Sequence, residues 1–75
     1  MKHFLIYYNY DIKDLDKDLV VLAEHRTMEV EAESRSKIDT DMIREKIRYV
    51  AHEARPHSNC EVIHANYYKI EEIKD

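Results

Sequence analysis

Three of the five histidines and the single cysteine follow one another in the C-terminal half, as His52, His57, Cys60 and His64. Imidazole nitrogen and thiolate sulfur are side-chain ligands that zinc prefers. If Cys60 and His64 share a strand, they lie about 13 Å apart, which is too far for one ion. A partial zinc site of His52, His57 and Cys60, completed by a second chain, is one alternative. We expect instead surface histidines and a buried cysteine, with no metal and no cofactor.

Several cationic side chains follow one flank of an expected helix and the turn after it: Arg44, Arg48, Arg55 and His57. At about 100° per residue the arginines lie next to the buried stripe of that helix. Guanidinium groups bind phosphate and carboxylate through two parallel hydrogen bonds. This pattern predicts a ligand-binding flank, such as a clamp for a small nucleotide. The alternative is a solvated surface in which Asp41 and Glu45 pair with the arginines.

Two segments that should be neighbouring strands each contain a tyrosine pair, Tyr7-Tyr8 and Tyr67-Tyr68. Tyr7 and Tyr67 could form an aromatic platform for a base, as in sheet-type binders of single-stranded nucleic acid. The alternative is cross-strand packing together with a contact between subunits, because tyrosine suits both strands and interfaces. We expect Tyr7 and Tyr67 to contact a ligand or partner.

The composition argues against catalysis. The chain has no glycine, which excludes phosphate-cradling loops of the nucleotide-binding type and an oxyanion loop near Cys60. A chain of 75 residues has little material for a pocket of about 300–1,000 Å³. No two carboxylates are placed for acid–base work. We therefore predict a protein that binds and is not an enzyme.

Residues 3–12 are rich in aromatic and β-branched types, which predicts a strand. One face carries the apolar residues Phe4, Ile6, Tyr8 and Tyr10, and the other carries Leu5 and Tyr7. A strand that is apolar on both faces is typical of the middle of a sheet. The polar residues 13–18 then form a connection.

Residues 19–33 permit two interpretations. Met28, Val30 and Ala32 alternate with glutamates, as in a half-buried strand. Extending that phase backwards turns Arg26 and Glu24 inward. Either a β-bulge near residues 24–27 resets the phase, or residues 15–26 form a short helix. We favour the bulged strand.

A helix is predicted over residues 36–55, with Ser36 or Asp39 as its cap and Pro56 ending it. Its buried face consists of Ile43, Ile47, Val50, Ala51 and Ala54. Residues 59–73 form a last strand. The expected fold is α+β: one ββαβ domain over residues 1–75, with a three-stranded antiparallel sheet in the order 2-1-3 and one helix on one face.

One helix leaves the other face of the sheet uncovered, and Leu5 and Tyr7 lie on that face. An uncovered apolar face is typical of an interaction site, so we expect a homodimer or larger assembly. The net charge of −4 makes duplex nucleic acid an unexpected partner. Because neither a signal peptide nor an apolar run of about 20 residues is evident, we expect a soluble, cytoplasmic protein without a membrane partner.

Four segments carry a resemblance at the level of pattern: residues 6–10 (IYYNY), 28–34 (MEVEAES), 43–47 (IREKI) and 68–73 (YKIEEI). Together they resemble small accessory proteins of bacteriophages and mobile elements that share a strand–strand–helix–strand plan. The resemblance implies a protein of the host cytoplasm that inhibits or sequesters a host component, such as a defence protein or a nucleotide signal. It assigns a role to no individual residue.

Overall fold

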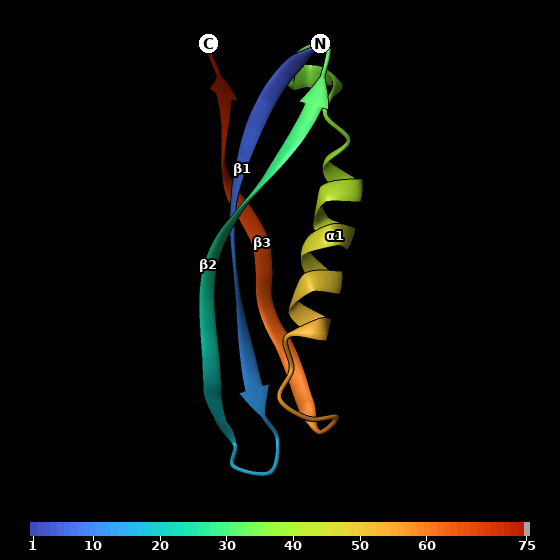
Figure 1. Ribbon diagram of the computed structural model, residues 1–75. Coiled ribbons are helices and arrows are strands. Elements are labelled where there is room, and N and C mark those ends of the chain that lie inside the picture. The colour runs from blue at the N-terminus through green and yellow to red at the C-terminus, as the bar shows by residue number, and fades with distance from the viewer. Residues whose placement is uncertain (75) are drawn as a thin grey trace.

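The computed structural model describes residues 1–74 and contains one three-stranded antiparallel sheet and one α-helix (Figure 1). In chain order the elements are β1 (Lys2–Asp14), β2 (Leu19–Ala32), a 3-10 turn (Arg35–Lys37), α1 (Thr40–Glu53) and β3 (Cys60–Ile73). The strand order is β2-β1-β3, so the predicted α+β fold and sheet order are confirmed.

The alternation of β1 determines the core. Its even-numbered apolar residues are buried on the face that α1 covers: Phe4, Ile6, Tyr8, Tyr10 and Ile12. The odd-numbered residues are half-buried on the opposite, open face. The Tyr10 hydroxyl is buried with no hydrogen-bond partner among residues 1–74. Burial raises the pKa of Tyr10, because the phenolate would lose its hydration.

The helix is shorter than predicted because residues 35–37 form a separate 3-10 turn. Asp39, not Ser36, caps α1, since its Oδ1 accepts a hydrogen bond of 3.1 Å from the Met42 N–H. Ile43, Ile47 and Ala51 are fully buried along one stripe. The helix ends at Glu53, three residues before the proline.

The predicted bulge near residues 24–27 is wrong, although the strand itself is confirmed. β2 pairs regularly with β1 from Leu22 to Ala32, and the register shift lies opposite Ile12 and Lys13. Arg26 and Glu24 therefore do lie on the helix side of the sheet. Such charges are tolerated there because α1 packs against β3 and β1 and contacts β2 far less. The Arg26 guanidinium lies 5.9 Å from the Tyr10 ring and 3.6 Å from Glu24.

β3 pairs with β1 and has two register irregularities. One lies between Tyr7 and Tyr8 of β1, and the other lies between Asn9 and Asp11. At the second irregularity His64 adopts φ 56°, a left-handed conformation. At the first, Tyr68 is the extra residue. Each irregularity changes which face the following side chains occupy, and the sequence gives no sign of either.

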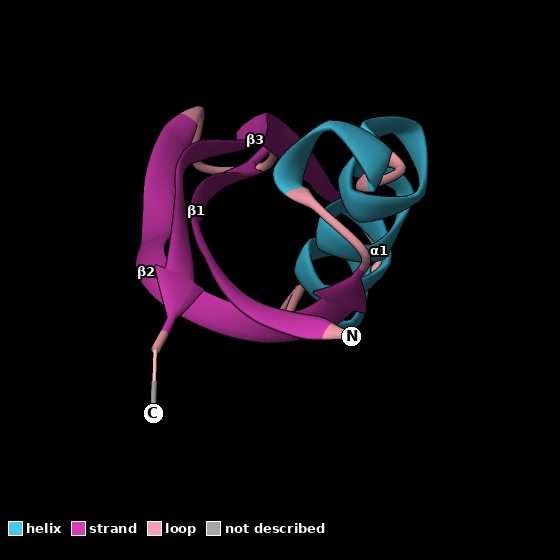
Figure 2. Ribbon diagram, turned by 90° about the horizontal axis from the view of Figure 1, so that it is seen from above, coloured by secondary structure: helices cyan, strands magenta, loops and turns pink. Residues whose placement is uncertain are grey.

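The molecule is long and narrow, with extents of 45 × 19 × 15 Å and a radius of gyration of 14.2 Å. Seen along its long axis, the sheet curls and α1 lies against its concave side (Figure 2). No helix within residues 1–74 is both long and apolar enough to cross a lipid bilayer.

Candidate functional site

The open face of the sheet is more polar than expected. Leu5 lies between Glu29 and Glu71 on the neighbouring strands. Tyr7 is covered on one side by Lys69, whose Nζ is 5.0 Å from the ring centroid. These charged neighbours break up the apolar surface that we expected around Leu5 and Tyr7, so this face gives less support to a contact between subunits than the sequence pattern did.

The two tyrosines of the expected platform lie on opposite faces. Tyr7 is on the open face, whereas Tyr67 pairs with Tyr8 on the helix side, where Arg44 lies 5.4 Å from its ring. The neighbour of Tyr7 is Tyr68, at 6.3 Å between centroids, and His25 lies 6.3 Å from Tyr68. The irregularity at Tyr68 causes this exchange of partners.

The helix arginines lie in three different environments. Arg44 pairs with Asp41 at 3.3 Å and stacks on Tyr67. Arg55 donates hydrogen bonds to the carbonyl oxygens of residues 52, 58 and 60 and so holds the turn between α1 and β3. Arg48 lines a groove of about 700 Å³ together with His52 and His64. A nucleotide clamp would require these arginines to converge on one point, and they do not.

A polar cluster with two buried members lies at the end of the molecule where β1 stops and β3 begins (Figure 1 shows this end of the sheet). It consists of Asp14, His57 and Cys60, and we call it the Asp14 cluster. Asp14 and Cys60 face each other in the β1–β3 register and are 4 % and 6 % exposed. His57 reaches them from the loop after α1. The spacing of histidines and cysteine in the sequence indicated His57 and Cys60 but not Asp14.

Hydrogen bonds determine how the Asp14 cluster is arranged. Asp14 Oδ1 accepts from the backbone N–H groups of Asp16 at 2.9 Å and Lys17 at 3.2 Å. Its Oδ2 lies 2.9 Å from His57 Nε2, and Cys60 Sγ lies 3.6 Å from the same nitrogen. Because His57 Nδ1 accepts from the Asn59 N–H, we assign the ring proton to Nε2. The hydrogen bond from His57 is the main reason that the pKa of Asp14 is below its ordinary value.

This geometry does not form a nucleophilic triad. In such a triad the thiol contacts one ring nitrogen and the carboxylate contacts the other. Here Cys60 and Asp14 both approach Nε2 of His57. The zinc alternative named His52, His57 and Cys60 as ligands. In the structure His52 instead forms a 2.6 Å hydrogen bond with Arg55, and Asp14 lies beside His57 and Cys60.

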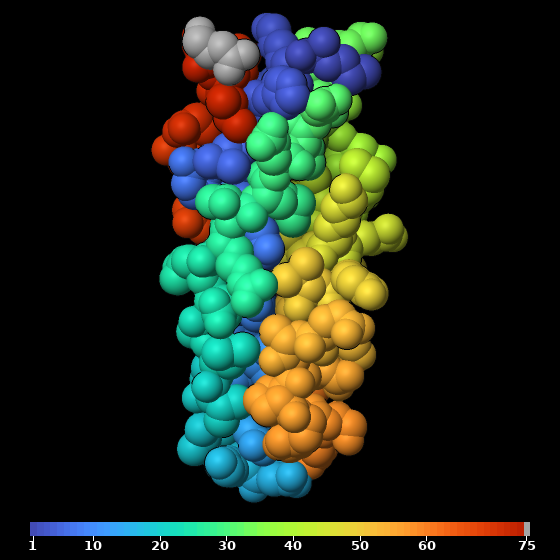
Figure 3. Space-filling view, viewed as in Figure 1, coloured from blue at the N-terminus to red at the C-terminus, as the bar shows by residue number. Residues whose placement is uncertain are grey.

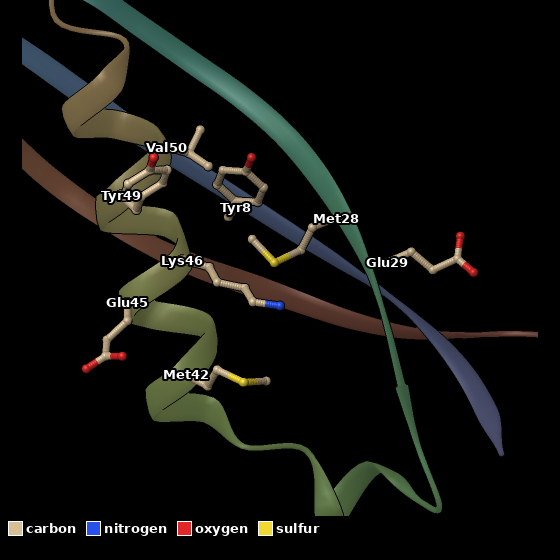
Figure 4. Close-up of a pocket in the computed structure, with 8 residues that line it drawn as sticks. All are labelled: Tyr8, Met28, Glu29, Met42, Glu45, Lys46, Tyr49 and Val50. Carbon is tan, nitrogen blue, oxygen red and sulfur yellow. The ribbon is translucent and has the colours of Figure 1, made fainter.

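A second feature is a groove of about 670 Å³ between α1 and β2, which we call the α1–β2 groove. Its apolar lining comprises Tyr8, Met28, Met42, Tyr49 and Val50 (Figure 4). Met42 and Tyr49 are 43 % and 69 % exposed. Glu29, Glu45 and Lys46 complete the lining, with both carboxylates turned away from the apolar side chains. In the space-filling view β1 is visible between β2 and α1 (Figure 3).

Next to this groove lies the outer edge of β2, which pairs with no strand among residues 1–74. β2 has no proline and no lysine, two residues that commonly protect an edge from association. Its register with β1 is unbroken from Leu22 to Ala32, and Leu19, Val20 and Val21 are exposed near its start. The outer edge of β3, in contrast, belongs to a strand with two irregularities. The edge of β2 is therefore the one suited to pairing with another strand.

Comparisons of the chain with protein-family models, with curated proteins and with solved structures give no match. The resemblance to small phage proteins therefore remains a prediction.

Proposed function

We propose that the protein is a non-enzymatic binding protein that forms a homodimer through the outer edges of β2. In this proposal the α1–β2 grooves beside the joint hold an apolar segment of a protein partner. The observation that supports it best is the long edge of β2, regular from Leu22 to Ala32 and without proline or lysine, beside an apolar groove. Inhibition of a host component remains the biological role that we predict for this binding.

The sequence of β2 is complementary to itself in one two-fold register. Antiparallel pairing centred on His25 places Arg26 opposite Glu24 of the second copy, and Glu24 opposite its Arg26. The same register places Met28 opposite Leu22 of the second copy. Because Glu24 is the sole acidic residue on the helix-side face of β2, no other two-fold register pairs Arg26 with a carboxylate. An isologous dimer requires this kind of self-complementarity.

Such a dimer has a continuous six-stranded sheet with both helices on one face. The two α1–β2 grooves then lie on that same face, one on each side of the joint. Each groove is apolar at its floor and has Glu45 and Lys46 of α1 at its rim, whereas the Glu29 carboxylate lies 3.0 Å from His3 on the open face of the sheet. The net charge of −4 and the exposed Glu45 favour a basic amphipathic segment of a protein as the partner. A nucleotide fits less well, because no arginine lines the groove.

The dimer is tested by exchanging the charges of β2. We expect Arg26→Glu to weaken dimerisation by about 10-fold or more, since it places like charges opposite each other twice in one dimer. Glu24→Arg should have the same effect, and the double exchange Glu24→Arg/Arg26→Glu should restore dimerisation. Sedimentation equilibrium measures the dissociation constants.

Lys37→Glu is the matched control, because it makes the same change of charge at an exposed position away from β2. Circular dichroism verifies that each variant is folded. A wild-type protein that stays monomeric at its highest soluble concentration would refute the dimer, as would a single exchange without effect.

The groove is tested with a helical peptide that has leucine on one face and lysine on the other. We expect the wild type to bind this peptide and Met42→Glu to bind it at least about 10-fold more weakly, as measured by fluorescence anisotropy. Met42 is half-exposed and lies outside β2, so the dimer should persist in this variant. The same peptide with glutamate for lysine is the control. Equal binding of both peptides, or no effect of Met42→Glu, would contradict the groove proposal.

A further inference from the structure

We infer that the Asp14 cluster is a binding site for one Zn²⁺ ion or a similar divalent transition metal. The ligands would be Asp14 Oδ2, His57 Nε2 and Cys60 Sγ, with water in the fourth position. These three side chains come from the end of β1, the loop after α1 and the start of β3. The inference is independent of the proposed dimer, because the cluster lies within one chain.

The spacing of the ligand atoms fits a tetrahedral ion. All three atoms lie within 4.8 Å of one another. At ordinary zinc–ligand distances, tetrahedral geometry separates a nitrogen from a sulfur ligand by about 3.5 Å. His57 Nε2 and Cys60 Sγ are already 3.6 Å apart. Nε2 and Asp14 Oδ2 are 2.9 Å apart and must separate by about 0.5 Å to admit the metal.

The surroundings prepare two of the three ligands. Two backbone N–H groups hold Asp14 Oδ1, which leaves Oδ2 directed at His57. Supporting hydrogen bonds of this kind orient carboxylate ligands in metal sites. Asp14 and Cys60 are direct partners in the sheet, so the backbone fixes their separation. His57 is exposed, with 42 % of its side chain accessible, and can adjust when an ion enters.

The donor set determines which ions are suitable. One sulfur, one nitrogen and one carboxylate oxygen suit zinc and cobalt, whereas magnesium and calcium prefer oxygen ligands alone. Binding would release the thiol proton of Cys60 and move the imidazole proton of His57 from Nε2 to Nδ1. Thiolate and carboxylate together would then neutralise a divalent cation in this largely buried place. Because Nδ1 now accepts from the Asn59 N–H, that hydrogen bond must break.

The test is a titration of the full-length, reduced protein with Co²⁺ and with Zn²⁺. We expect one equivalent of Co²⁺ to bind and to produce thiolate-to-cobalt charge-transfer absorption with intense d–d bands, which report four-coordinate geometry. One equivalent of Zn²⁺ should remove these bands. In amide NMR spectra, the Asn59 signal should move on addition of Zn²⁺.

Cys60→Ser is the decisive variant, because it keeps the Asp14–His57 hydrogen bond and nearly the same side-chain size. It should lose the charge-transfer absorption and weaken Zn²⁺ binding by more than the roughly 10- to 100-fold that loss of a supporting group costs. His57→Ala should weaken binding similarly. His52→Ala and His64→Ala are matched controls and should bind as the wild type does. Binding of less than one equivalent, absence of the thiolate band, or binding that Cys60→Ser leaves unchanged would overturn the site.

Discussion

Replacing Ile47 with alanine is expected to lower the free energy of unfolding by about 2–5 kcal/mol. Ile47 is fully buried in the middle of the one helix that covers the sheet, where its side chain belongs to the core cluster. Removing three carbon atoms there leaves a cavity between α1 and the sheet. Because a domain of this size has a stability near the lower end of about 5–15 kcal/mol, the variant should retain about 3 kcal/mol or less.

Urea denaturation followed by circular dichroism measures the decrease in the free energy of unfolding caused by Ile47→Ala. Arg48→Ala, at the next and exposed position, is the matched control and should change stability by about 0.5 kcal/mol or less. Since both residues are replaced by the best helix former, the comparison separates packing from helix propensity. Equal stability of the two variants would contradict the packing of α1 on the sheet.

Replacing Asp14 with alanine is expected to lower the melting temperature of the metal-free protein by more than about 5 °C. The change removes the acceptor for two backbone N–H groups in the β1–β2 turn and for His57 Nε2. These hydrogen bonds are partly buried, and loss of the acceptor leaves three donors without their partner. Differential scanning calorimetry in the presence of a chelator measures the effect without any contribution from bound metal.

Two further variants make the Asp14 result specific. Glu53→Ala removes a carboxylate from an exposed position and should leave the melting temperature nearly unchanged. Asp14→Asn keeps one oxygen acceptor for the turn and should fall between the wild type and Asp14→Ala. If Asp14→Ala and the wild type have the same melting temperature, Asp14 does not stabilise the β1–β2 turn and the loop after α1.

Local patterns were sufficient to predict the elements, and the rule that crossover connections are right-handed then predicted their order in the sheet. The alternation of Phe4, Ile6 and Tyr8 identified the central strand, and the spacing of Ile43 and Ile47 identified the helix face. Both patterns reflect burial, and the spacing of the buried residues, two in a strand and three or four in a helix, distinguishes the two.

The prediction failed where it assumed that the whole inner face of the sheet is covered. Arg26 and Glu24 lie on that face, and α1 leaves β2 open to solvent there. The position of the helix across the sheet depends on packing between distant segments, and no local pattern reports it. The exchange of Tyr67 and Tyr68 has a similar cause, because the irregularity in β3 is a property of two strands together.

The candidate sites were predictable only in part. The sequence places His57 and Cys60 close together, but Asp14 precedes His57 by 43 residues and joins them through strand pairing. One signal was present, since Asp14 continues the even-numbered, buried phase of β1. A carboxylate in the phase of the core needs a partner, and this rule could have identified the cluster.

The narrow shape of the molecule has a consequence for any study of its mass in solution. A compact chain of this length has a radius of gyration of about 11 Å, against 14.2 Å here. An elongated particle diffuses more slowly and leaves a gel-filtration column earlier than a sphere of equal mass. The elution volume of a single subunit would therefore overestimate its mass, and it does not by itself determine the number of subunits.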